Sequence, residues 1–177
     1  MNGTGLRAEA NRNNKQKRKN MINIKKGPGL SLGQVDKVAK PAASAGTIEA
    51  GQVVKLHATD GTAVLPSGAS DTGLLGFAIT DSTDGDAIES GKIGILLLDG
   101  VSVIETDKTG GTAITSTNFN VGANLTCTSA GAVAVATGSD RVIGKVEGIR
   151  NLPSVETVNG VKVQSTRAFL GIKLAAI

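Results

Sequence analysis

Aromatic side chains are almost absent from this 177-residue chain, which has three Phe and no Trp or Tyr. A core without large rings must be built from Val, Ile, Leu and Ala, and these bury less apolar surface per side chain. The length suits one domain of ordinary size. We therefore expect a modestly stabilised single domain that gains further stability by packing against neighbouring subunits.

Cysteine and histidine are equally scarce, with one residue of each, Cys127 and His57. A single cysteine excludes an internal disulfide. A catalytic or metal role for His57 would need a carboxylate or a second ligand, and the strand around it supplies only Lys55 and Thr59. We predict an exposed strand position for His57 and a small, buried or half-buried strand position for Cys127.

Long apolar runs are also missing, since no window approaches the length that a membrane-spanning helix needs. The N-terminus carries charge and Asn where a secretory signal would have an apolar segment. We expect a protein that is made and used without secretion and without a membrane partner.

Motifs that bind metals or phosphates are incomplete. Four carboxylates gather at Asp81, Asp84, Asp86 and Glu89, but the alternating ligands of a calcium loop are not there, so a solvated turn is favoured. Two glycine-rich pieces lack the Lys-Ser/Thr ending of a phosphate loop and are interpreted as flexible joints: Gly3-Thr4-Gly5 and Thr109-Gly110-Gly111-Thr112. The sequence predicts no catalytic residue, no cofactor and no metal site, and hence a protein that is not an enzyme.

Glycine is abundant instead, with 24 residues against 4 prolines, which suits many short strands joined by tight turns. Apolar and polar residues alternate over 53–58, as in a half-buried strand. Residues 92–98 are apolar on both faces and predict a central strand. Asp99-Gly100 predicts a hairpin from this strand into 101–105, and Asn159-Gly160 predicts another tight turn.

The order of these features occurs twice. Each copy has a Gly before a short apolar strand, a turn, a second alternating strand, a strand with a central Gly, and an apolar closing run. The first copy has Gly51, Gly76 and 93–98, and the second has Gly122, Gly144 and 169–174. The chain is therefore predicted to be all-β, a single small β-barrel or sandwich built from two similar halves, at about 45–105 and 120–174. The duplication favours the barrel.

Charge divides the chain into an arm and a body. Through Lys40 there are ten Lys and Arg against two acidic residues, a net charge of +8, whereas the remainder has nine against thirteen, a net charge of −4. We predict an extended basic arm and linker over 1–42 and a β-body over 43–177. The partner-binding residues expected in the arm are Arg7, Arg12, Lys15, Lys17, Arg18, Lys19, Lys25 and Lys26.

Two partners suit this arm. The cations could bind nucleic-acid phosphates without sequence specificity, or they could run along an acidic protein surface. The arm has no aromatic residue to stack on bases, which favours the protein surface.

Several runs of the body carry a resemblance to a known family: Gly51-Gln52-Val53-Val54-Lys55-Leu56, Thr62-Ala63-Val64-Leu65-Pro66, Gly76-Phe77-Ala78-Ile79-Thr80-Asp81 and Gly94-Ile95-Leu96-Leu97-Leu98-Asp99-Gly100-Val101. This rhythm resembles small tailed-phage head decoration proteins, also called capsid cement or stabilising proteins. The likeness covers about 45–105 well and 120–174 more loosely. The long basic arm departs from the short N-termini usual in that group.

The resemblance implies a non-enzymatic virion protein on the outside of an icosahedral shell, made in the host cytoplasm. Its implied partners are the major capsid protein at capsomer junctions and further copies of itself, often as a trimer. Nucleic acid bound through the arm is the alternative that the sequence leaves open.

Overall fold

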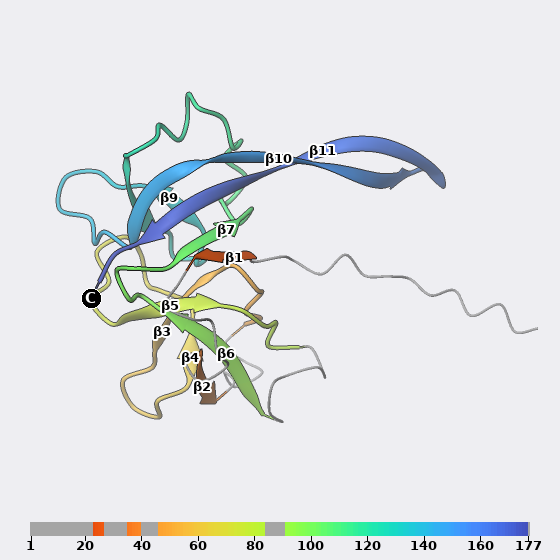
Figure 1. Cartoon of the computed structure of the whole chain (residues 1–177). Helices are drawn as coiled ribbons and strands as arrows, with labels where there is room; N and C mark the ends of the chain where they lie inside the picture. The colour runs from red at the N-terminus through yellow and green to blue at the C-terminus, as the bar shows by residue number, and fades with distance from the viewer. Residues whose placement is uncertain (1–22, 27–34, 40–45, 84–90, 177) are drawn as a thin grey trace, which may run out of the picture.

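The computed structural model describes residues 23–26, 35–39, 46–83 and 91–176. These residues form two antiparallel sheets (Figure 1), which confirms the all-β prediction. Of the two architectures left open, the strand pairing gives two separate sheets, one of them curved as a half-barrel. The first sheet contains β2 (Val35–Ala39), β3 (Val53–Leu56), β4 (Ala63–Val64), β5 (Leu74–Ala78) and β6 (Lys92–Leu97). The second contains β1 (Asn23–Lys26), β7 (Val103–Thr106), β8 (Asn124–Cys127), β9 (Val133–Val135), β10 (Gly144–Val158) and β11 (Val161–Leu174).

The predicted duplication appears as a repeated pairing scheme. The first sheet has the order β2-β6-β5-β3-β4, and the second has β7-β11-β10-β8-β9 with β1 added beyond β7. Taken in chain order, each strand from β7 to β11 pairs as its counterpart from β2 to β6 does, and all of these pairs are antiparallel. Each half of the chain therefore builds one sheet.

Hydrogen bonds at the start of each half match as well. The N–H of Gly51 donates to the carbonyl of Ala78 at 2.7 Å, and the N–H of Gly122 donates to the carbonyl of Val146 at 2.8 Å. Both glycines have positive φ, +91° and +84°, a conformation that residues with a Cβ adopt rarely. The two glycines that occupy equivalent places in the sequence pattern thus form equivalent turns, one in each half.

The predicted hairpin at Asp99-Gly100 is wrong, because β6 and β7 belong to different sheets. The carboxylate of Asp99 accepts the N–H groups of Val101 and Ser102 at 2.9 and 2.8 Å, and it also accepts the Ser102 hydroxyl. Gly100 donates its N–H to Ala175. These bonds lead the chain out of the first sheet, and β7 then pairs with β11. β7 therefore pairs with strands of the second half, and its position in the second sheet is the one that β2 has in the first sheet.

Aliphatic side chains from both sheets make the main core, together with Phe77 and Phe119. A smaller cluster lies on the other face of the first sheet, where Val54, Ala78 and Ile95 are buried with Ile48, Ala63 and Ile93. Residues that follow one another in a strand fall into different clusters, as alternation requires. β6 is therefore buried on both faces, as the sequence predicted for a central strand.

The two central glycines lie directly against the closing strands. A Cβ at Gly76 would stand 1.9 Å from the carbonyl oxygen of Leu96 in β6, and one at Gly144 would stand 2.5 Å from that of Lys173 in β11. Both distances are shorter than real Cβ atoms allow, and the obstacle is backbone in each case. Each half therefore contains the same kind of close backbone contact, which only a glycine permits.

We predict that Gly144→Ala lowers the free energy of unfolding by about 2 kcal/mol or more, because β10 and β11 must separate to admit the methyl group. Gly148→Ala in the same strand is the matched control, since nothing lies within 4 Å of its would-be Cβ. That variant should stay within about 0.5 kcal/mol of the parent. Urea unfolding measures both, and equal effects would contradict the close contact.

Candidate interaction surface

The long β10–β11 hairpin extends beyond the rest of the second sheet (Figure 1). Its inner part is paired on both sides, with β8 against Gly144–Lys145 and β7 against Leu170–Lys173. From the pair Asn151↔Ala168 to the tip, no third strand joins it among the described residues. We call residues 151–168 the outer hairpin. Its eight cross-strand pairs reach roughly 27 Å at about 3.4 Å per residue.

The tip is the tight turn that the sequence predicted. Asn159 and Gly160 connect Val158 to Val161 and have φ of +49° and +81°. Positive φ at both central residues is the mark of the type I′ turn, for which Asn-Gly is the favoured pair. This turn fixes the register of the whole hairpin, and with it the face on which each side chain lies.

Three valines form an exposed apolar surface on one face of the tip. Val158 and Val161 are a cross-strand pair, and Val163 lies two residues further along the same face, opposite Glu156. Their exposed fractions are 52%, 63% and 44%, far above those of core valines. We call this surface the valine face. The opposite face carries one valine among polar residues: Val155, Thr157, Lys162 and Gln164.

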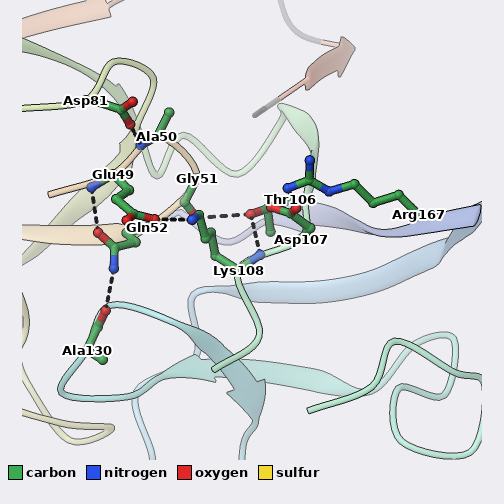
Figure 2. A network of polar contacts seen from close by, with 10 residues as sticks. All are labelled: Glu49, Ala50, Gly51, Gln52, Asp81, Thr106, Asp107, Lys108, Ala130 and Arg167. Atoms are coloured by element: carbon green, nitrogen blue, oxygen red, sulfur yellow. Dashed lines mark hydrogen bonds and ion pairs between the residues drawn. The ribbon is translucent and has the colours of Figure 1, made fainter. Parts of the chain in front are cut away.

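Two arginines anchor the hairpin to the body. Arg150 donates to the carboxylate of Glu105 from Nη2 at 2.5 Å and from Nε at 3.1 Å. Arg167 forms an ion pair with Asp107 and lies over the ring of Phe169, 5.6 Å from its centroid (Figure 2 shows the Asp107 contact). Both carboxylates are largely buried. The inner end of the outer hairpin is therefore held against the body.

The last residue of β7 and the residues just after it also tie the two halves together (Figure 2). Lys108 forms an ion pair with Glu49, which precedes β3. The hydroxyl of Thr106 donates to the carbonyl of Gly51 at 3.1 Å and accepts the N–H of Lys108 at 3.1 Å. Asp107 and Lys108 are neighbours in sequence, so one short segment braces the hairpin on one side and the first half on the other.

The predicted arm residues mostly lie outside the described residues. Lys25 and Lys26 are in β1, which pairs with β7, and nothing is described of their side chains. Arg7, Arg12, Lys15, Lys17, Arg18 and Lys19 all precede residue 23. The sequence analysis missed Arg150 and Arg167, because their partners are 45 and 60 residues away and no local pattern pairs them.

His57 is exposed, as predicted, but it lies just after the end of β3 and not in a strand. It has a carboxylate partner that the sequence analysis did not find, since its Nδ1 lies 2.9 Å from Oδ1 of Asp60. Hydrogen bonds from the N–H and hydroxyl of Thr62, and then from His57, lower the pKa of Asp60 to about 2. The contacts are those of a turn held together by an aspartate cap.

Cys127 is fully buried in β8, also as predicted. Burial raises the pKa of its thiol to about 11, and the negative charge of Asp71 adds to this effect. The sulfur lies 3.7 Å from the carbonyl oxygen of Gly68. A thiol in this environment is almost entirely protonated at neutral pH, which is the opposite of an activated nucleophile.

The acidic turn is only partly described. Asp81 accepts the N–H of Ala50 at 2.5 Å, so its carboxylate caps the backbone that enters β3. Asp84, Asp86 and Glu89 lie outside the described residues. Where the structure is described, no three His, Cys, Asp or Glu side chains gather in a way that could hold a metal ion. The same part of the chain contains no helix long and apolar enough to cross a membrane.

Comparisons with protein-family models, with curated proteins and with solved structures found no match for this chain.

We predict that Arg167→Ala lowers the free energy of unfolding by about 1–3 kcal/mol, because it leaves the largely buried Asp107 carboxylate without its ion pair. Lys162→Ala, on the exposed part of the same strand, is the control and should cost less than about 0.5 kcal/mol. The double variant Asp107→Asn, Arg167→Ala should recover part of the loss. Identical unfolding curves for Arg167→Ala and Lys162→Ala would refute the anchoring role.

The thiol of Cys127 should resist labelling in the folded protein. We expect a thiol reagent such as dithiobisnitrobenzoate to react slowly with the native chain and to release one equivalent once the chain is unfolded in guanidinium. The raised pKa alone lowers the thiolate fraction about 100-fold relative to an ordinary thiol. Rapid native labelling would restore Cys127 as a candidate nucleophile.

Proposed function

We propose that this chain is a virion structural protein that binds the shell of a tailed phage at capsomer junctions and stabilises it without catalysis. The body sits at the junction, and the basic N-terminal arm crosses neighbouring capsid subunits. The major capsid protein is its principal partner.

The residues behind the family resemblance support this proposal by their placement. The runs that begin at Gly51, Gly76 and Gly94 lie in or beside β3, β5 and β6, which are hydrogen-bonded neighbours in the first sheet. The similar rhythm of the second half builds the matching strands of the second sheet. The runs that carry the resemblance therefore belong to the paired strands of the body. In the proposed role, this strand framework is the part of the cement protein that contacts the shell.

The observation that carries the proposal is the braced hairpin. Its inner end is fixed by Arg150 and Arg167, while its outer end presents exposed valines. Ion pairs also join one part of the body to another at Lys55–Asp71 and Lys108–Glu49. A body cross-linked in this way resists deformation, and a projecting apolar face suits contact with protein. Both properties serve a component that holds larger subunits together.

The basic arm supplies a second contact with the shell, in addition to that of the hairpin. The arm through Lys40 has a net charge of +8, whereas the rest of the chain has −4. Such an arm is attracted to acidic protein surfaces and gains many weak contacts along its length. In a shell with many copies, shallow contacts on both sides of a seam add up because each binds only the assembled state.

The test is co-sedimentation with empty shells of the phage that encodes the chain. We expect saturable binding by the full chain and at least tenfold weaker binding after deletion of residues 1–20, which removes six cations and one carboxylate but spares β1. A full-length variant with those six cations changed to Gln is the matched control for charge and should bind as weakly as the deletion.

Two outcomes would contradict the proposal. One is no binding of the full chain to shells. The other is tight binding to DNA or RNA at physiological salt in a gel-shift assay, lost on deletion of residues 1–20. That second result would establish the rival function, a nucleic-acid-associated protein that binds phosphates through its arm.

A further inference from the structure

We propose that the hollow between Lys145 and Lys173 binds the carboxylate of a Glu or Asp side chain in an acidic segment of a partner protein. The hollow lies in the body, at the end of the second sheet where β10 begins and β11 ends (Figure 1). It is separate from the basic arm, so the site goes beyond the proposed function and does not depend on it.

The two lysines face each other across neighbouring strands. Lys145 in β10 and Lys173 in β11 are direct cross-strand partners, and both are exposed. The Cβ atoms of such a pair lie about 4.5–5.5 Å apart, and like charges placed directly opposite each other destabilise a sheet. An anion bound between the two ammonium groups would remove this repulsion.

The chain itself does not supply that anion among its described residues. Neither ammonium group forms an ion pair or a hydrogen bond there. Glu147, two residues from Lys145, lines a different hollow, and the carboxylate of Asp99 caps the turn that follows it. Other cations of the body do have carboxylate partners: Lys55, Lys108, Arg150 and Arg167.

The hollow combines this charge with apolar walls. Its volume is about 360 Å³, and ligand pockets in proteins begin at roughly 300 Å³. An anionic group on a short aliphatic stem suits it, because the ammonium groups bind the anion while the walls contact the stem. Besides the two lysines, the lining residues are Gly100, Val142, Gly144, Leu174, Ala175 and Ala176.

Backbone contacts fix these walls. Ala175 donates its N–H to the carbonyl of Ile143 at 2.9 Å, and its own carbonyl accepts the N–H of Gly100 at 3.1 Å. A Cβ at Gly100 would lie 2.9 Å from the Cβ of Ala176, so the turn packs directly against the residues after β11. The walls are therefore in place before a ligand binds, which lowers the entropic cost of binding.

The lining favours a protein carboxylate over nucleic acid. Among the described lining residues there is no aromatic ring and no Arg, so a base has nothing to stack on. Residues 41–177 carry nine Lys and Arg against thirteen Asp and Glu, so the body as a whole repels a long polyanion. A single acidic side chain needs only the local charge of the two lysines.

A second hollow along the same two strands lacks this property. It has a volume of about 350 Å³, and its charged lining residues are Glu105, Glu147 and Arg150. Arg150 is already paired with Glu105. The positive charge of this second hollow is therefore compensated from within the chain, whereas that of Lys145 and Lys173 is not.

An NMR titration of the full chain at low salt tests the site. The probe is the peptide acetyl-Leu-Glu-Glu-Leu-amide, and acetyl-Leu-Gln-Gln-Leu-amide is the uncharged control of the same shape. We expect the acidic peptide to shift the amide resonances of residues 142–145 and 173–176 saturably and the control peptide to leave them unchanged. Affinity is read from these resonances, because the arm also carries cations.

A pair of variants on the same strand isolates the role of the lysines. Lys173→Gln should weaken binding about tenfold or more, because it removes a charge-assisted hydrogen bond. Lys162→Gln is the matched control, since Lys162 is also exposed in β11 and lies away from the hollow, and it should bind like the parent. Equal affinities of the two variants would overturn the proposal, and so would unshifted resonances in the parent.

A third variant supplies the carboxylate from within the chain. Lys145→Glu should abolish peptide binding at this hollow and raise the urea midpoint of unfolding, because opposite charges then face each other across the strands. A lowered midpoint would contradict the repulsion between Lys145 and Lys173. Tighter binding of a thymidine oligonucleotide of equal charge at the same resonances would overturn the assignment to a protein carboxylate.

Discussion

The fold depends on a backbone contact that recurs once in each half: β5 pairs with β6, and β10 pairs with β11, at a glycine that lies against the backbone of its partner strand. Gly76 meets Leu96 and Gly144 meets Lys173, with no room for a Cβ at either position. Because the chain has so few aromatic rings, its core is filled by Val, Ile and Leu, and such a core is tight only if the strands approach closely. The two glycines make that approach available, and the same five-strand pairing follows in both halves.

The sequence predicted those features that local chemistry determines. The duplicated glycine pattern, the Asn159-Gly160 turn and the buried Cys127 could all be predicted because each depends on a few neighbouring residues. Asp99-Gly100 has the same local signature as a hairpin turn, but pairing of β7 with β11 prevailed over it. Such a competition between a local turn preference and distant strand pairing cannot be resolved from one sequence.

The candidate surface was harder to foresee than the fold. The sequence predicted a tight turn at Asn159-Gly160, but nothing in it indicated that β10 and β11 continue as one long hairpin beyond the sheet. The carboxylates that pair with Arg150 and Arg167 lie in β7 and just after it, and only the folded chain brings them near. The valines of the tip follow ordinary strand alternation, and the register set by the Asn159-Gly160 turn places them together on one exposed face.

These features connect structure to the proposed role. Through Asp107 and Lys108, one short segment joins the hairpin to the first half of the body by ion pairs. In the proposed role, the basic arm of each copy would add its own contacts to a shell. Multivalency of this kind converts weak single contacts into durable attachment.

Hydrogen exchange of the purified parent chain and of its Gly144→Ala and Gly148→Ala variants, followed by mass spectrometry, tests the central claim most directly. The account predicts that residues 169–174 are protected in the parent and in Gly148→Ala and exchange markedly faster in Gly144→Ala. Unchanged protection of residues 169–174 in Gly144→Ala would contradict it, because the contact with Lys173 would then tolerate a Cβ.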